Sequence, residues 1–295
     1  MTGASFELTP RGSFSWPAAF TVLARFAPLA HVWAGDAREV RLSLLADGDL
    51  APVDVTLSFD GALRGRVSDP MRGEAIARQV ARIFSLDHDG TGWGALPVAS
   101  LVPGLRPVCF SSPYEAACWA ILSQRIAKTQ AARIVAALVD AHGHFPLPEQ
   151  LLRLDRIRGV PAIKIDRLHA VARAAKDGVL DAERLRALGD DAGPASLLAL
   201  PGIGPFWSSG IYLRACGIRD VFPREPLSVA ALARFAGLGP APSAEDVQRA
   251  AERFRPFRMW ACFALRVAAG DQGTGSMVTA SSRHAKGTAA ASTPM

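Results

Sequence analysis

The chain has 295 residues, of which 49% are hydrophobic, and its formal net charge is +6. This length allows one large domain or two to three small ones, and the apolar content argues against general disorder. The positive charge favours an acidic partner such as nucleic acid. The chain opens without a secretory signal and has no apolar run long enough to span a bilayer, so we expect a cytoplasmic protein without membrane contacts.

The first hundred residues have a mixed α/β pattern. Residues 39–45 and 53–59 alternate or run apolar as strands do, and residues 46–49 between them form a turn signal. Residues 71–84 carry apolar side chains at the spacing of an amphipathic helix. We therefore predict a small N-terminal α/β domain over residues 5–105, with a small sheet and one or two helices.

From about residue 105 the pattern becomes helical. Ser112-Pro113-Tyr114-Glu115 is typical of a capping box with proline at the first helical position. A further helix is predicted to end near Gly143, and another is predicted to begin at Ser243. The other predicted helices cover residues 148–155, 163–176, 180–188, 194–199, 228–235 and 256–269. We predict an all-helical core over residues 106–270. Residues 271–295 are rich in Gly, Ser, Thr and Ala, so we expect a disordered tail there.

The four cysteines form no CxxC pair. They are Cys109, Cys118, Cys216 and Cys262, and three of them fall in stretches predicted to be buried helix. We expect reduced thiols in the core of the protein.

The most informative motif is Leu200-Pro201-Gly202-Ile203-Gly204, which precedes an apolar helix. Two glycines two apart let the backbone turn tightly and approach a ligand closely. The free amides at the start of the next helix would face outward, ready for a phosphate. This is the physics of a helix-hairpin-helix. An ordinary helix–helix turn is the alternative, and the complete motif favours the DNA-binding interpretation.

Three stretches carry a family resemblance: residues 200–223 (LPGIG to DVFP), residues 120–124 (AILSQ) and residues 255–258 (RPFR). Together they resemble the helix-hairpin-helix DNA glycosylases, and among these the AlkA type, 3-methyladenine-DNA glycosylase II. The resemblance covers residues 5–270 and is most specific from 110 to 265. It implies a mostly α fold, with a small α/β N-terminal domain before a glycosylase core of two helical subdomains.

The resemblance implies a DNA glycosylase of base excision repair, acting on damaged double-stranded DNA as a monomer associated with the nucleoid. Such an enzyme rotates an alkylated purine of the 3-methyladenine type out of the duplex and hydrolyses its N-glycosidic bond. Phe206 falls on a base-pocket position of the family, and also where bifunctional members carry the lysine that forms a Schiff base. The resemblance therefore implies a monofunctional enzyme that requires no cofactor.

The resemblance also indicates how the DNA backbone is held. The residues expected to bind DNA, in the hairpin and in the loop that separates the strands, are Gly202, Ile203, Gly204, Gln124 and Arg125. Arg125 is expected to fill the gap that the flipped base leaves. A monovalent cation, Na+ or K+, is expected on the backbone carbonyls of Leu198, Leu200 and Gly202.

An alkylation glycosylase needs an aromatic base pocket, because a methylated purine is electron-poor and often cationic. Phe206 supplies one such ring, but a second pocket position of the family, in the final helix, falls on Arg266. Trp119, Trp207 and Trp260 are candidates to replace it, although core packing is the favoured interpretation of each.

The catalytic acid of the family is replaced in this chain. The family pattern D-V-F-P-x-x-D ends in an aspartate that stabilises the cation-like sugar and assists the attacking water. Aligned from Asp220, the chain carries Pro226 at that position, where proline fits the first turn of a helix but supplies no charge. Glu225 is the adjacent acid and our candidate substitute, although neighbouring positions at a helix start point about 100° apart.

Several hypotheses remain open at this point. Glu225 serves as the acid, or the cationic leaving base needs little help; Asp220 is a second candidate, although its family counterpart is usually structural. The alternative function is a catalytically weak or inactive protein that binds damaged DNA, which Pro226 favours. A third is a glycosylase-like fold used only for protein contacts.

Overall fold

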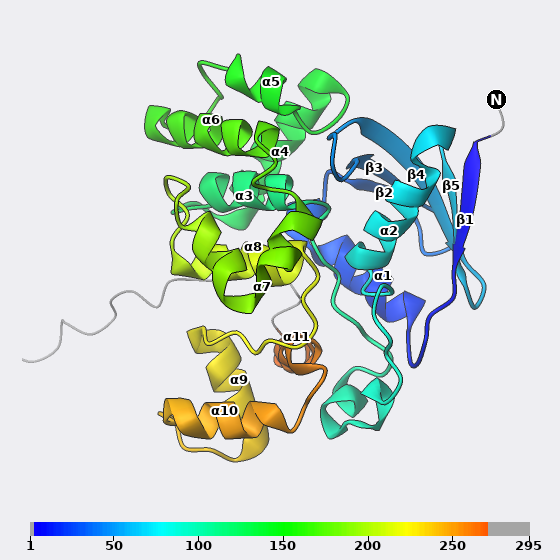
Figure 1. Cartoon of the computed structure of the whole chain (residues 1–295), viewed down its shortest axis with the longest axis vertical. Coiled ribbons are helices and arrows are strands. Elements are labelled where there is room, and N and C mark those ends of the chain that lie inside the picture. Colours follow the sequence, from blue (N-terminus) through cyan, green and yellow to red (C-terminus); the bar gives the residue numbers. More distant parts are fainter. Residues whose placement is uncertain (1–2, 271–295) are drawn as a thin grey trace, which may run out of the picture.

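The computed structural model describes residues 3–270 and combines a five-stranded sheet with a larger group of helices (Figure 1). Every pair of neighbouring strands is antiparallel, in the order β1-β5-β4-β3-β2. The strands are β1 (Ala4–Leu8), β2 (Trp33–Gly35), β3 (Val40–Leu45), β4 (Pro52–Phe59) and β5 (Leu63–Val67). The tail predicted for residues 271–295 lies outside the described residues.

Most of the remaining described chain is helical, which confirms the predicted mostly α fold with a small sheet near the N-terminus. The α-helices are α1 (Trp16–Arg25), α2 (Gly73–Ile83), α3 (Pro113–Leu122), α4 (Lys128–His142), α5 (Pro148–Leu152), α6 (Ala162–Lys176), α7 (Ala182–Leu197), α8 (Pro205–Ala215), α9 (Pro226–Ala236), α10 (Ala244–Glu252) and α11 (Arg258–Ala268). The 3-10 helices are η1 (Ala27–Leu29), η2 (Pro70–Arg72), η3 (Trp93–Ala95) and η4 (Pro97–Leu101).

The central strands form because their side chains alternate between a buried and an exposed face. In β3, Val40 and Leu42 are buried while Arg41 between them is exposed. Helix α2 packs against β1 and β5, with Ile76 and Val80 fully buried. The two strands and the helix predicted for this region are confirmed. Strands β1, β2 and β5 were not predicted, because they are only three to five residues long.

Two predictions about the helices can be compared with the structure. Residues 180–188 and 194–199 were expected to form separate helices, and α7 does consist of two helical segments separated by non-helical backbone at Gly189, where φ is 82°. The second segment begins before residue 194, earlier than predicted. Ser112 caps α3 by accepting from the Glu115 amide at 3.1 Å. The Glu115 carboxylate, however, bonds to His31 at 3.2 Å, so the expected capping box forms only by half. The Glu115 side chain is buried (4% exposed), and its other carboxylate oxygen lies 3.5 Å from the Ser112 hydroxyl at the helix start.

Two hydrophobic clusters pack the described residues. The larger cluster joins the sheet to α3–α8 and contains residues on both sides of position 105. The domain boundary predicted at that position therefore stays a prediction. The smaller joins α9–α11 to η3 and η4. Helix α11 belongs to both clusters, with Met259 and Phe263 in the larger and Trp260 in the smaller. In Figure 1, α9–α11 accordingly form a group of their own below α3–α8.

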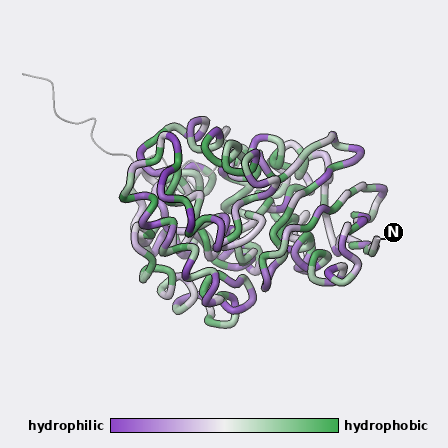
Figure 2. The backbone as a smooth tube through the Cα atoms, turned by 90° about the horizontal axis from the view of Figure 1, so that it is seen from above, coloured by the Kyte–Doolittle hydropathy of each residue, from purple (hydrophilic) through white to green (hydrophobic). Residues whose placement is uncertain are grey.

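Hydrophilic and hydrophobic residues are mixed within the elements of the described part. Figure 2 shows hydrophilic and hydrophobic residues interleaved along the tube. Between residues 3 and 270, no helix has both the length and the apolar character needed to cross a bilayer. All four cysteines are buried and free, which confirms the prediction of thiols in the core.

Candidate functional site

The turn between α7 and α8 contains the two glycines of the LPGIG motif. Gly202 has a φ of +87°, and a Cβ there would lie 2.6 Å from Arg167 Cδ and 2.9 Å from Ile121 Cδ1. Gly204 is exposed with a φ of −93°, and a Cβ there would meet nothing within 4 Å. The fold itself therefore requires Gly202, whereas Gly204 leaves the outer surface of the turn open.

The start of α8 is suited to hold an anion. Gly204 is its N-cap residue, and no side chain in the described part of the chain caps this end. The amides of Phe206 and Trp207 lie in the first turn, where N–H groups lack intrahelical partners and the helix dipole is positive. The side chain of Ile203 is buried, so only its backbone is available to a ligand.

The loop after α3 lies directly beside this turn. Gln124 donates from Nε2 to the Gly202 carbonyl at 2.8 Å, and its Oε1 accepts from Arg167 at 3.3 Å. The next residue, Arg125, is exposed and has a positive φ of 59°. The structure thus brings Arg125 and the hairpin turn to one surface, while the Gln124 amide bonds within the protein. The DNA contacts predicted for both residues stay predictions.

Several exposed arginines, in this loop and further along the chain, have no acidic partner in the described structure. Across residues 3–270, no carboxylate pairs with the exposed guanidinium groups of Arg125, Arg156 or Arg158. By contrast, the sheet residue Arg64 pairs with Glu7 at 2.7 Å. Guanidinium groups that are not neutralised by the protein are available to bind phosphates.

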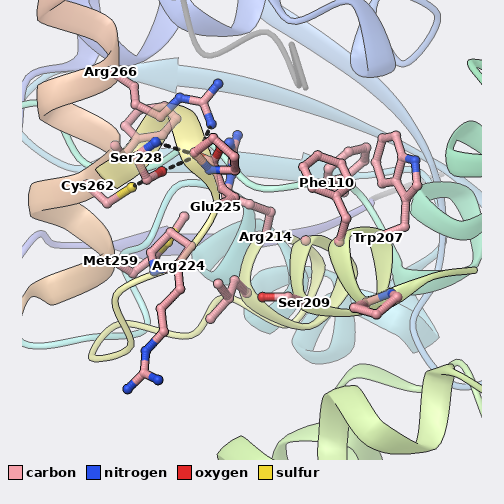
Figure 3. A pocket seen from close by; sticks show the side chains of 17 residues that line it. Phe110, Trp207, Ser209, Arg214, Arg224, Glu225, Ser228, Met259, Cys262 and Arg266 are labelled. Atoms are coloured by element: carbon pink, nitrogen blue, oxygen red, sulfur yellow. Dashed lines mark hydrogen bonds and ion pairs between the residues drawn. The ribbon is translucent and has the colours of Figure 1, made fainter. Parts of the chain in front are cut away.

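A pocket of about 410 Å³ adjoins the start of α8 and lies between α8, α9 and α11 (Figure 3). Its walls are mostly apolar and aromatic, and Glu225 is the one carboxylate among the lining residues. The residues that line it are Phe110, Pro205, Phe206, Trp207, Ser209, Gly210, Leu213, Arg214, Pro223, Arg224, Glu225, Pro226, Ser228, Met259, Cys262, Phe263 and Arg266. Phe206, Glu225, Pro226 and Arg266, which sequence analysis singled out one by one, therefore meet in one cavity.

The Glu225 carboxylate is held at the pocket wall by several donors. It accepts hydrogen bonds from the amides of Leu227 and Ser228, each at 2.9 Å, and from the Ser228 hydroxyl. It also pairs with Arg266 across 2.7 Å, the two side chains being 13% and 15% exposed. Figure 3 shows Ser228 of α9 and Arg266 of α11 on either side of Glu225, with dashed lines marking their interactions. The carboxylate is therefore fixed in position, and its charge is partly balanced by Arg266.

The start of α9 shows how Pro226 and Glu225 are placed relative to the pocket. Pro226 is the first residue of α9, which confirms that proline fits a helix start here. Glu225 is the N-cap residue with extended backbone. The expected turn of about 100° between neighbours applies only inside a helix, so Glu225 is not directed away from the cavity that Pro226 lines. Asp220 does not line this cavity; it pairs with Arg258 at 2.9 Å and with Arg255 at 3.3 Å.

The aromatic residues divide between core and pocket. Trp119 and Trp260 are buried at 3% and 1% exposure, which confirms core packing for both. Trp207 is half-buried and has both roles, since it packs against the larger hydrophobic cluster and also lines the pocket. Its ring meets that of Phe206 edge-on, with centroids 5.6 Å apart. Sequence analysis missed Phe110, which reaches the pocket from the segment just before α3.

One thiol borders the pocket. Cys262 Sγ lies 2.9 Å from the Ser228 hydroxyl. Burial raises the pKa of this thiol to about 12, which keeps it neutral beside the Glu225 carboxylate. Cys262 therefore contributes packing and no nucleophile to the wall.

Comparison with known proteins finds relatives among DNA glycosylases. No family model matches the chain. Over 213 residues it is 29% identical to DNA-3-methyladenine glycosylase 2 of Escherichia coli, covering 65% of this chain and 71% of that protein. It is 34% identical over 205 residues to a probable bifunctional transcriptional activator/DNA repair enzyme AlkA of Mycobacterium tuberculosis, spanning 61% of this chain but only 40% of that relative.

Solved structures share the fold over most of the chain. A 3-methyladenine DNA-glycosylase from Archaeoglobus fulgidus has a TM-score of 0.68 at 20% identity, covering 90% of this chain and 98% of that one. The Clostridium acetobutylicum 8-oxoguanine glycosylase/lyase, solved with DNA, has a TM-score of 0.62 at 13% identity, covering 92% and 100%. The chain is thus similar in sequence to DNA-3-methyladenine glycosylase 2 and shares its fold with solved DNA glycosylases. It departs from the site that this resemblance implies at Pro226 and at Arg266.

Proposed function

We propose that this protein is a DNA glycosylase of base excision repair that hydrolyses the N-glycosidic bond of alkylated purines after base flipping. The main observation in support of this function is the aromatic pocket next to the hairpin turn, with the Glu225 carboxylate in its wall. A cavity of about 410 Å³ fits one base and part of its sugar. The names of the relatives support an enzyme of this kind over a damage-binding protein without chemistry.

The aromatic walls suit an electron-poor base. Phe206 and Trp207 project from the first turn of α8 and present two rings at right angles, at an interplanar angle of 88°. A cationic methylated purine gains more from such π faces than an unmodified base does. Stacking therefore selects the damaged base once it has left the duplex.

Glu225 is the proposed electrostatic residue. As the glycosidic bond breaks, positive charge develops on the sugar, and a fixed carboxylate nearby stabilises that charge without reorganising. The two helix amides and Arg266 fix the carboxylate but also weaken its field. An alkylated purine is a good leaving group, so a carboxylate with a weakened field is enough to release it. An undamaged base is a poorer leaving group and is not released.

We propose that the enzyme is monofunctional. No lysine is among the residues that line the pocket in the described structure, and Phe206 stands at the position expected for a Schiff-base lysine. Borohydride should therefore trap no covalent complex with substrate DNA. A trapped complex would assign the protein to the bifunctional branch, which the 8-oxoguanine glycosylase/lyase among its structural neighbours represents.

The hairpin is also the proposed site of a monovalent cation, Na+ or K+. The Leu200 carbonyl accepts from the Ile203 amide at 3.0 Å, and the Gly202 carbonyl accepts from Gln124 at 2.8 Å. A carbonyl oxygen has two lone pairs, so these two groups and that of Leu198 fit a cation in addition. Replacing K+ by tetramethylammonium at constant ionic strength should weaken duplex binding, and unchanged binding would exclude the site.

Base release from methylated duplex DNA under single-turnover conditions tests the function. We expect release by the wild type and a rate at least about tenfold lower for Glu225→Gln, equivalent to about 1.4 kcal/mol of barrier. Glu245→Gln is the matched control, because Glu245 is an exposed acid on the neighbouring α10. Equal rates for wild type and Glu225→Gln would exclude the role of Glu225, and absence of release by the wild type would exclude the activity.

A further inference from the structure

Two cations at the start of α6 contact the loop that carries Arg125. Lys164 is 8% exposed, and its Nζ donates to the backbone carbonyls of Leu122 and Gln124, each at 2.7 Å. Arg167 lies one turn later and donates to the Gln124 side chain at 3.3 Å. Residues three apart lie on one face of a helix, so both cations act on the same loop.

The position of Lys164 is unfavourable unless these contacts offset it. A cation in the first turn of a helix meets the positive end of that helix's dipole. Burial also lowers the pKa of Lys164, and the nearby charge of Arg167 lowers it further. The compensation comes from α3, whose last carbonyls form the negative end of a second helix. Lys164 thus caps α3 from a neighbouring helix.

Arg167 extends this support to the hairpin turn. A Cβ on Gly202 would lie only 2.6 Å from Arg167 Cδ, so the arginine stem packs directly against the glycine. Gln124 bridges the same two partners, accepting from Arg167 and donating to the Gly202 carbonyl. The loop and the turn therefore rest on one common support.

Arg125 needs such a support. Its φ of 59° is uncommon for a residue other than glycine, so the backbone is strained there. Such a conformation persists only where the surroundings impose it. The hydrogen bond from Lys164 to the Gln124 carbonyl acts on the peptide unit that joins Gln124 to Arg125.

We propose that Lys164 and Arg167 are positioning residues, which lock the Arg125 loop against the hairpin turn. The side chain that fills the gap in the duplex and the amides that hold the phosphate then keep a fixed separation. This inference rests on the proposed function, since it assigns Arg125 and the turn to DNA. Neither Lys164 nor Arg167 lines the base pocket, so both act through their neighbours.

The test uses a duplex with a tetrahydrofuran abasic analogue next to 2-aminopurine, whose fluorescence rises when stacking is disrupted. We expect Lys164→Met and Arg167→Met to slow that rise about tenfold, the scale of one lost charge-assisted hydrogen bond. Affinity for undamaged duplex at the same salt concentration should stay within about twofold, because the arginines at the surface remain. Lys176→Met is the matched control, an exposed lysine on the same helix that pairs with Glu149.

A double-mutant cycle separates positioning from general stability. In an Arg125→Ala background, Lys164→Met should slow the rise by less than about twofold, because the residue through which it acts is gone. An undiminished effect in that background would overturn the inference, as would a wild-type rate in both single variants. Arg167 is only half-buried, so the Arg167→Met variant should fold and can be used for the same test if Lys164→Met fails to fold. Binding and fluorescence changes without base release would contradict the proposed activity while supporting this inference.

Discussion

Arg266 on α11 and Glu225 at the start of α9 form an ion pair of 2.7 Å, and both residues line the pocket. The pair joins two helices of the smaller hydrophobic cluster at the pocket wall. It places a positive charge beside the one carboxylate of the pocket lining. The electrostatic field that Glu225 exerts in the pocket therefore depends on this partner as well as on the position of the carboxylate.

Removing that partner should increase the effect of Glu225. Arg266→Met leaves the carboxylate on the Leu227 and Ser228 amides but unbalanced, so release of an alkylated base should be faster, by about tenfold at most. The unfolding midpoint should fall, because a mostly buried charge loses its partner. Single-turnover rates and thermal unfolding measure the two effects. A slower rate would assign Arg266 to substrate binding, and Arg249→Met on the surface of α10 is the control.

The two hairpin glycines should respond differently to alanine. Gly202→Ala should lower the free energy of unfolding by about 1–3 kcal/mol, because of its positive φ and the contact with Arg167. Gly204→Ala should leave stability nearly unchanged, since its Cβ meets open space. It should nevertheless weaken duplex binding, if DNA backbone approaches that surface. Denaturant unfolding and binding titrations separate the two, and unchanged binding by Gly204→Ala would contradict the close approach.

The tryptophans of pocket and core offer a second contrast. Trp207→Ala should cost little stability but slow the release of an alkylated base, since base–aromatic stacking contributes about 1–3 kcal/mol. Trp260→Ala should lower the free energy of unfolding by about 3–5 kcal/mol, because its ring is 1% exposed. Release rates at a temperature where both variants are folded test the assignment. A normal rate for Trp207→Ala would remove Trp207 from the base site.

The cysteines predict a dependence on pH. Burial raises the pKa of Cys216 and of Cys262 from the ordinary 9.0 to about 12. The unfolded chain then ionises first, so stability is present below pH 9 and declines as the pH rises from 9 towards 12. At pH 8 the native thiols should react with iodoacetamide about a thousandfold more slowly than in denaturant. Rapid labelling of the native protein would contradict their burial.

The sequence by itself determined most of the helices, two of the strands and the family resemblance. The turn at Gly202 and Gly204, the proline start at Pro226 and the amphipathic period of α2 are local signals, because each depends on backbone conformation or on spacing along one helix. The same local signals carry the resemblance to helix-hairpin-helix glycosylases. Short strands such as β5 were not predicted, because a segment of five residues is too short for its alternating pattern to stand out in the sequence.

Only the tertiary structure decided how the site is assembled. The Glu225–Arg266 pair joins residues 41 apart in sequence, and the contact from Lys164 to the Gln124 carbonyl joins residues 40 apart. Neither pair has a signal in local spacing, because hydrogen bonds between helices depend on how those helices pack. Trp207 and Trp260 illustrate the same limit, since both are tryptophans in apolar helices and only packing places one in the pocket and the other in the core.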